Sequence, residues 1–204
     1  MEITISSQVK DPERIRQRRA EIVRAAVGLF AEKGFHRTTT REIAQASGLS
    51  TGALYEYVAS KEDVLFLVCR HIHHTILQQL KASLAVEGPA VQRLRQSIQA
   101  FIGVMDSMQD EVLLIYQESK SLPSPFLHEV LRQESEITQV FDNLLHEGIR
   151  DGSLRTSPKN VPLLAHDIVV AGQMWAFRRW ALNTMDFADF AASQTERLME
   201  ACGS

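Results

Sequence analysis

Cysteine is scarce in this chain of 204 residues, which contains only Cys69 and Cys202. Two cysteines cannot build the framework of several disulfides found in small secreted domains, so they fit a reducing cytoplasm. Long apolar runs are also missing, since "VLFLVC" at 64–69 is far shorter than the roughly 18 residues that span a bilayer. The opening "MEITISSQVK" lacks a basic start followed by an apolar stretch, so no signal peptide is expected. These absences predict a cytoplasmic protein with no membrane partner.

The usual sequence signatures of enzymes are absent too. The chain has no glycine-rich phosphate loop, no G-x-S-x-G and no convincing pair of carboxylates. Glu118 and His128 are isolated polar residues for which no third catalytic partner is expected. An enzyme is therefore not expected, and no cofactor is predicted.

Net charge is small, at −3, but it is unevenly distributed. Residues 10–41 hold nine Lys and Arg against four acids, whereas from residue 65 onward the acids outnumber the bases by four. A basic segment on an acidic body is the distribution expected when one end of a protein meets phosphate. A solvated helix face would carry the same charges, so the distribution alone decides little.

Helical periodicity runs through nearly the whole chain, and no alternating strand pattern is present. Proline and glycine mark the breaks, for example Gly34, Gly88-Pro89 and "SLPSPF" at 121–126. The fold class is therefore all-α, with about nine helices, short ones first and long ones after. The pattern places these helices at about 12–33, 40–46, 51–57, 61–86, 89–106, 110–120, 126–151, 158–183 and 186–201.

The stretch "TTTREIAQASGLSTGALYEYVASKEDVL" at 38–65 contains two short helices joined by a tight turn. Thr39 to Glu42 forms a capping box, Gly48 supplies the turn, and Ser50 can cap the second helix. This spacing matches a helix-turn-helix, whose second helix enters the major groove of DNA. Residues 10–60 are accordingly expected to form a three-helix DNA-binding domain.

DNA contacts are expected where these short helices begin. Exposed N–H groups and the helix dipole favour a phosphate at Thr39 and Thr40, and the start of the second helix usually reaches base edges. Thr39 and Ser50 are first of all N-caps, and Tyr55 could equally be a packing residue. The candidate DNA-binding residues are Thr39, Thr40, Arg41, Ser50, Thr51, Gly52, Ala53, Tyr55, Tyr57 and Lys61.

The same stretch resembles the N-terminal DNA-binding domain of the TetR family of bacterial transcriptional regulators. The family pattern is a threonine-rich start, "IA..AG", "S.G.LY.YF" and "SKE.L", and "AAVGLFAEKGF" at 25–35 matches its first helix. The resemblance covers about residues 17–68 and places phosphate contacts on Thr40, Tyr55, Tyr57 and Lys61. It implies a homodimeric repressor on a palindromic double-stranded operator, released by a small-molecule effector. Residues 61–204 would then form a larger helical domain for ligand binding and dimerisation.

A candidate dimer interface follows from residues 161–176, which are apolar nearly all round and therefore expected to be buried on both sides. Small residues there would allow close helix approach, and the resemblance implies that the last two helices pair with their symmetry mates. A central core helix would explain the same pattern. The candidate interface residues are Ala165, Val169, Gly172, Ala176 and Trp180.

The resemblance also implies a ligand pocket enclosed by the middle helices, 61–150. "LLIYQESKSLP" and "MWAFRRWAL" are similar to family members that respond to fatty acyl-coenzyme A or related lipid metabolites. A mostly apolar ligand fixed by a few polar groups fits that composition. The candidate ligand-binding residues are Tyr116, Gln117, Gln173 and Arg178, although such arginines more often pair with surface acids.

A metal- or redox-responsive regulator is the alternative, because Cys69 and His73 lie four residues apart on one helix face, a spacing that can chelate Zn²⁺. A structural zinc site usually needs four ligands, and neither CxxC nor HExxH accompanies the pair. We therefore assign no metal, and leave open whether Cys69, His71, His73 and His74 bind one.

Overall fold

The computed structural model describes residues 3–84 and 88–203, and within these ranges the chain forms nine α-helices, two short 3-10 helices and no strand. The expected all-α class is therefore confirmed. The expected end of the fourth helix near Val86 lies outside the described residues. The chain divides into two compact units, unit 1 (Met1–His73 and Leu113–Gln133) and unit 2 (His74–Val112 and Glu134–Ser204).

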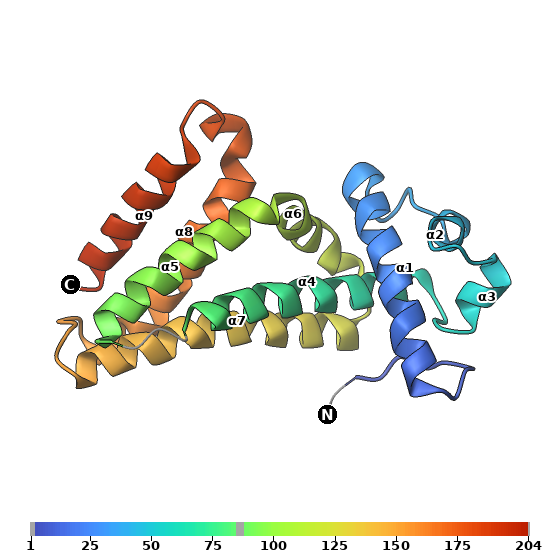
Figure 1. Cartoon of the computed structure of the whole chain (residues 1–204), viewed down its shortest axis with the longest axis horizontal. Helices are drawn as coiled ribbons and strands as arrows, with labels where there is room; N and C mark the ends of the chain where they lie inside the picture. The colour runs from blue at the N-terminus through green and yellow to red at the C-terminus, as the bar shows by residue number, and fades with distance from the viewer. Residues whose placement is uncertain (1–2, 85–87, 204) are drawn as a thin grey trace. The chain divides into compact units, whose positions relative to one another are not determined.

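Unit 1 is built around three N-terminal helices, of which α1 packs on α2 and α2 on α3 (Figure 1). Helix α1 begins after the Asp11 cap, whose carboxylate accepts from the amides of Glu13 and Arg14, and it ends at Gly34 with a φ of +79°. Later segments complete the unit. Its elements are α1 (Pro12–Lys33), α2 (Thr40–Ala46), α3 (Thr51–Tyr55), the start of α4 (Lys61–Ser83), the end of α6 (Gln109–Glu118), η1 (Ser119–Ser121) and the start of α7 (Ser124–Arg150).

The core of unit 1 fixes the short helices by burying their apolar residues. Ile22, Ile43 and Leu54 are fully buried, one from each of the first three helices. Phe30 meets Phe35 edge to face, with ring centroids 5.5 Å apart. Since full burial of one such side chain stabilises by about 1.5–3 kcal/mol, helices of five and seven residues depend on this packing to persist.

Unit 2 contains α5 (Ala90–Ser107), the start of α6, η2 (Pro158–Asn160), α8 (Val161–Leu182), α9 (Phe187–Ala201) and the ends of α4 and α7. Helix α5 packs on both α8 and α9, and α9 doubles back beside α8 after a short turn (Figure 1). The indole N–H of Trp175 donates to Asp106 Oδ1 at 2.7 Å, which ties α8 to α5. Among the described helices, none is both long and apolar enough to cross a bilayer.

Candidate nucleic-acid interface

The two short helices α2 and α3 are each held at their first turn by a side-chain cap. At α2 the Thr39 hydroxyl accepts from the Glu42 amide, and the Glu42 carboxylate accepts from the Thr39 amide at 2.8 Å, which completes the capping box. At α3 the Ser50 hydroxyl accepts from the Ala53 amide at 3.1 Å. Each cap is worth about 1 kcal/mol, so these residues are structural before they are anything else.

The turn between the two helices depends on Gly48, whose φ of +70° is unfavourable for residues with a side chain. Just after it, the Leu49 amide donates to the Ala44 carbonyl at 2.8 Å and closes the end of α2. The chain therefore reverses within a few residues, as a helix-turn-helix requires.

The start of α3 is open to solvent, since Thr51 and Gly52 are exposed and Ala53 is half-buried. Tyr55, at 40% exposure, donates its hydroxyl to Thr40 Oγ1 at 3.2 Å, joining the end of α3 to the beginning of α2. Arg41 is exposed beside Thr40. These residues form a polar surface that places a hydroxyl pair and a guanidinium at the beginning of α2 and leaves the start of α3 exposed.

Tyr57 does not belong to this surface, which corrects the expected contact. Its side chain is only 2% exposed and packs in the core of unit 1. A buried phenol cannot reach a DNA phosphate. Tyr55, which is exposed, therefore remains a candidate DNA contact, whereas Tyr57 is a core residue.

Lys61 is placed differently from the expectation as well. Its ammonium donates to the carbonyls of Phe35 and Thr38 at 2.9 and 3.0 Å, with the His36 carbonyl at 3.4 Å, and lies 4.3 Å from the centroid of the Phe35 ring. A lysine has three donors, and these carbonyls match all of them. In this structure Lys61 closes the turn between α1 and α2, and a phosphate contact would require it to leave those carbonyls.

Arg19 is a functional candidate that the sequence did not single out. Its guanidinium donates to the carbonyls of Ile5, Ser6 and Tyr57 at 2.8–3.0 Å. Burial lowers the pKa of this guanidinium, although an arginine remains charged. Nothing in the local pattern distinguishes Arg19 from the other arginines of α1, because its partners lie up to 38 residues away in the sequence.

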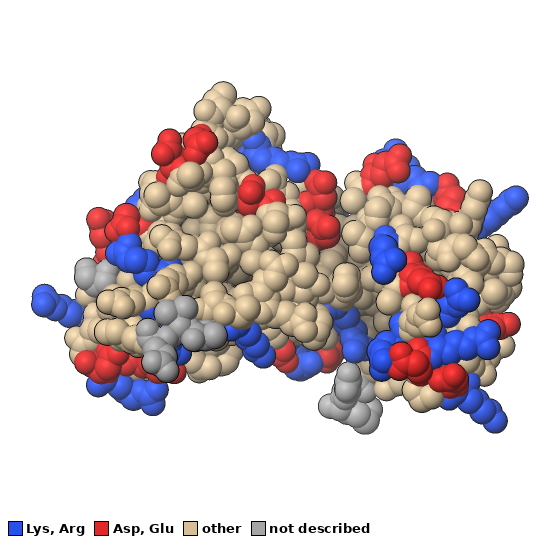
Figure 2. Space-filling model, in the orientation of Figure 1, with Lys and Arg blue, Asp and Glu red and all other residues tan. Residues whose placement is uncertain are grey.

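The basic charge of unit 1 is interspersed with acids, as the right-hand part of Figure 2 shows. Arg18 pairs with Glu21 at 2.8 Å, and Lys33 pairs with Glu42. The Lys33 ammonium, together with hydrogen bonds from Thr39, lowers the pKa of Glu42 to about 2. Part of the positive charge counted in the sequence is therefore neutralised within the unit.

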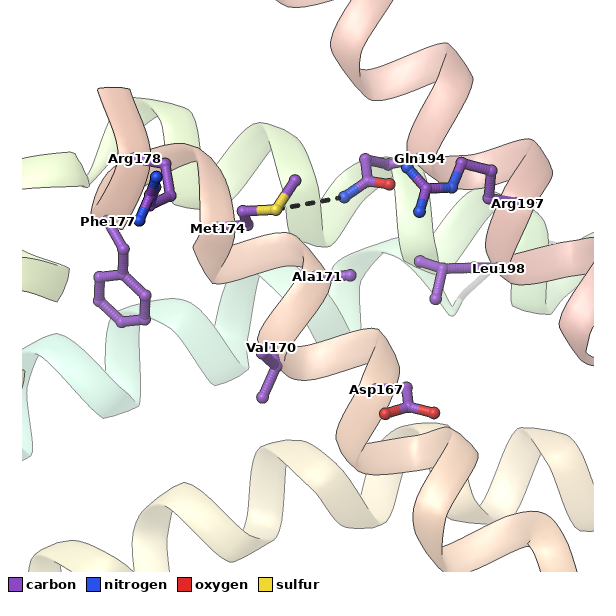
Figure 3. Close-up of a pocket in the computed structure, with 9 residues that line it drawn as sticks. All are labelled: Asp167, Val170, Ala171, Met174, Phe177, Arg178, Gln194, Arg197 and Leu198. Carbon is purple, nitrogen blue, oxygen red and sulfur yellow. Dashed lines mark hydrogen bonds between the residues drawn. The ribbon is translucent and has the colours of Figure 1, made fainter. Parts of the chain in front are cut away.

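A hollow lies between α8 and α9 in unit 2, with a volume of about 470 Å³ (Figure 3). Apolar side chains line most of it, and Gln194 reaches across from α9 to the sulfur of Met174 at 3.9 Å. Charged groups stand at its edges. The lining residues are Asp167, Val170, Ala171, Met174, Phe177 and Arg178 from α8, and Gln194, Arg197 and Leu198 from α9.

Four of the five predicted interface residues face away from solvent, which corrects that prediction. Ala165, Val169, Gly172 and Ala176 are buried within unit 2, where the ring of Phe101 packs directly on Gly172. Only Trp180 is exposed, at 69%. The sequence is apolar on both faces of α8, so periodicity could not decide which of them the chain's own core covers.

The four predicted ligand residues are not collected by one described pocket. Tyr116 is exposed, and Gln117 lines a polar hollow beside the turn after α1. In unit 2, Gln173 is buried and donates to Glu134 at 3.0 Å, whereas Arg178 stacks over Trp180 at 4.9 Å. Their assignment to a ligand stays a prediction.

The environment of Cys69 disfavours the metal and redox alternative. Both Cys69 and His73 are buried, and burial raises the pKa of the Cys69 thiol to about 12. The thiolate, which both metal binding and oxidation need, is thus strongly disfavoured at neutral pH. Across the described residues, no three His, Cys, Asp or Glu side chains gather as a metal site would require.

Comparison with known proteins agrees with this geometry. The family model for bacterial regulatory proteins of the tetR family matches residues 22–68, and the model for tetracyclin repressor-like C-terminal domains matches residues 87–175. The HTH-type transcriptional regulator HbdR of Aromatoleum sp. (strain CIB) is 30% identical over 178 residues, which cover 87% of this chain and 77% of HbdR.

Solved structures show the same fold. A tetR-family regulatory protein from Rhodococcus RHA1 superposes with a TM-score of 0.81 at 24% identity, covering 92% of this chain and 97% of its own. AibR, solved in complex with isovaleryl coenzyme A and operator DNA, gives a TM-score of 0.73 at 17% identity, covering 89% of this chain and 98% of its own.

Proposed function

Because this chain belongs to the TetR family and is a DNA-binding transcriptional regulator, we propose that it acts as a homodimeric repressor on a palindromic operator. In this proposal a small, mostly apolar ligand of the acyl-coenzyme A class releases the protein from DNA. The expected domains, 10–60 for DNA binding and 61–204 for ligand binding and dimerisation, are part of the same proposal.

The observation that carries the proposal is the exposed start of α3, together with the Thr40–Tyr55 hydroxyl pair that joins the other end of α3 to the start of α2. Thr51 and Gly52 leave room for close approach to base edges, since neither has a long side chain. Thr40 and Arg41 offer donors to the phosphates on one side, and Tyr55 joins them when its hydroxyl turns from Thr40 to a phosphate. Thr39 and Ser50 contribute indirectly, by capping the helices that present these groups.

A single helix-turn-helix contacts few phosphates, so a homodimer, which places two DNA-binding domains on two half-sites, is expected to bind more tightly. We assign the partner surface to the solvent side of α8. Leu163 and Val170 are 67% and 58% exposed, and Met174 and Phe177 continue the same face at spacings of three and four residues. Monomeric proteins rarely leave such an apolar stripe uncovered. A second copy would cover the stripe and the adjoining hollow between α8 and α9.

The acyl-coenzyme A class is proposed from the resemblance of two segments and from AibR, whose structure holds isovaleryl coenzyme A. Release would be a population shift, in which the ligand binds better to a dimer whose DNA-binding domains are wrongly spaced. Helix α4 is the natural carrier of such a signal, because Lys61 to His73 belong to unit 1 and the rest of the helix belongs to unit 2.

Selection of duplexes from a random-sequence pool by the purified protein tests the DNA-binding part. The expected product contains two inverted half-sites with centres about 34 Å apart, bound by one dimer. Selection of no duplex, or of a single half-site bound by a monomer, would overturn the proposed function.

A further inference from the structure

The N-terminal arm, residues Ile5–Lys10, is docked beside the recognition helix α3. Ile5 is only 5% exposed, so the arm has an apolar anchor. Farther along, the Ser7 hydroxyl and the Gln8 amide both donate to the Glu56 carbonyl, at 2.8 and 2.9 Å. The arm is thus held at both its beginning and its middle.

These contacts satisfy backbone groups that α3 leaves open. The last carbonyls of a helix have no partner within it. Here the arm supplies the partner of the Glu56 carbonyl, and Arg19 supplies that of the Tyr57 carbonyl. Because Arg19 also holds the carbonyls of Ile5 and Ser6, one guanidinium fixes the arm and the end of α3 together.

Two exposed cations lie where the docked arm meets α1: Lys10 ends the arm, and Arg14 lies in the first turn of α1. The acids next to them are already engaged, since Asp11 caps α1 and Glu13 pairs with Arg16. Within the described part of the chain, neither cation forms an ion pair. Their charges are therefore available to another molecule.

The position of Lys10 is limited by its distance from Gln8. Gln8 is bonded to Glu56 at the end of α3, and two residues extend the chain by at most about 7 Å, so the backbone of Lys10 stays close to that end. Helix α3 has only five residues, so Thr51 at its start is also near. A major groove is about 12 Å wide, so phosphates flank a helix inserted into it at this range. Glu56 is an exposed acid on the same surface, and a cation beside it would offset its repulsion of those phosphates.

We propose that Lys10, at the end of the docked N-terminal arm, and Arg14, in the first turn of α1 that follows it, are DNA-backbone contacts to the phosphates that flank α3. This inference rests on the proposed function, because it needs the protein to bind a duplex. It adds a binding surface that the helix-turn-helix pattern does not contain. The contacts would strengthen binding without reading sequence.

The salt dependence of operator binding tests the inference. With a duplex selected by the wild type, the association constant is measured by fluorescence anisotropy from about 50 to 200 mM salt. Each lost phosphate contact makes the plot of the logarithm of the association constant against the logarithm of the salt concentration shallower by about 0.9. A dimer loses two contacts, so Lys10→Ala should change this slope by about 1.8, and Arg14→Ala should do the same. Lys159→Ala removes an equal charge from exposed η2 in unit 2 and should leave the slope unchanged.

Slopes for Lys10→Ala and Arg14→Ala equal to that of Lys159→Ala would overturn the inference while leaving the proposed function intact. If the wild type selected no duplex, the proposed function itself would fail first. Ile5→Ser tests the role of docking in the full chain. It should reproduce the slope of Lys10→Ala, and adding Lys10→Ala to it should change little more. A wild-type slope for Ile5→Ser would show that docking does not position the contact.

Discussion

Tyr55 and Tyr57 stand two residues apart and yet serve different purposes. Tyr55 is exposed and bonded to Thr40, whereas Tyr57 is buried, with its hydroxyl near Arg18. We expect Tyr55→Phe to weaken operator binding at least tenfold, because a hydrogen bond to a charged group is worth about 1.5–3 kcal/mol. Its thermal unfolding should change little, because the lost hydrogen bond to Thr40 is exposed and water replaces it.

Tyr57→Phe is the matched control for that prediction. It should lower the free energy of unfolding by about 0.5–1.5 kcal/mol by removing a buried hydroxyl that interacts with Arg18, and leave operator affinity of the folded protein unchanged. Anisotropy titrations and urea unfolding of both variants separate the two effects. The assignment fails if Tyr57→Phe is the variant that loses affinity.

Glu42 links the capping box of α2 to the last turn of α1 through Lys33. Because its pKa is lowered to about 2 in the folded protein, the ionised carboxylate stabilises the fold above its ordinary pKa of 4.5, and this contribution is lost as pH falls toward 2. Glu42→Gln should therefore lower Tm at pH 7, and the difference from wild type should shrink below about pH 4.5.

Thermal unfolding at several pH values checks this. Glu32→Gln, an exposed acid on α1 to which no cap or ion pair is assigned, should change Tm less at pH 7. A Glu42→Gln protein as stable as the wild type at pH 7 would contradict the role given to the carboxylate.

At the scale of elements, two helical glycines in unit 2 have opposite surroundings. A Cβ on Gly172 of α8 would lie 2.5 Å from the Phe101 ring, whereas a Cβ on Gly103 of α5 would meet nothing within 4 Å. Gly172→Ala should therefore destabilise by about 1–3 kcal/mol through overpacking. Gly103→Ala should stabilise by about 0.5–1 kcal/mol, because alanine loses less backbone entropy in a helix. Urea unfolding measures both, and changes of the same sign would contradict the packing of α5 on α8.

The solvent side of α8 makes a prediction about assembly. Val170 is 58% exposed, so Val170→Lys should leave the protomer folded but shift the protein from dimer to monomer in sedimentation velocity. Leu131→Lys, at a residue of similar exposure on α7, is the control and should remain dimeric. If the Val170→Lys protein remained a dimer, the partner surface would not be the solvent side of α8.

Most elements could be predicted from the sequence because their ends carry local signals. The capping box at Thr39, Gly48 and the Asp11-Pro12 pair place α1 and α2 within a residue or two of the structure. What could not be predicted depends on tertiary contacts. The side of α8 that its own core covers, the burial of Tyr57 and the partners of Arg19 and Lys61 are fixed by residues distant in the sequence.

At the scale of the whole molecule, the proposed release by a ligand requires that this ligand also stabilise the folded protein. An acyl-coenzyme A thioester at 100 times its dissociation constant should add about 2.7 kcal/mol to the free energy of unfolding, visible as a rise in Tm. The same compound should reduce operator affinity, because the two binding events are linked. A panel of thioesters of different chain length and free fatty acids, scanned by thermal unfolding, is the measurement. No shift with any thioester would exclude this ligand class and leave DNA binding unaffected.

The docked N-terminal arm bears on how the protein is best prepared. A purification tag fused ahead of the arm would extend the segment that packs beside α3, and a run of histidines there would bring extra cationic groups toward the DNA as pH falls. Operator affinities and salt slopes obtained with such a tag would describe the tag and the arm together. Cleaving the tag before titration would restore the arm's own contribution.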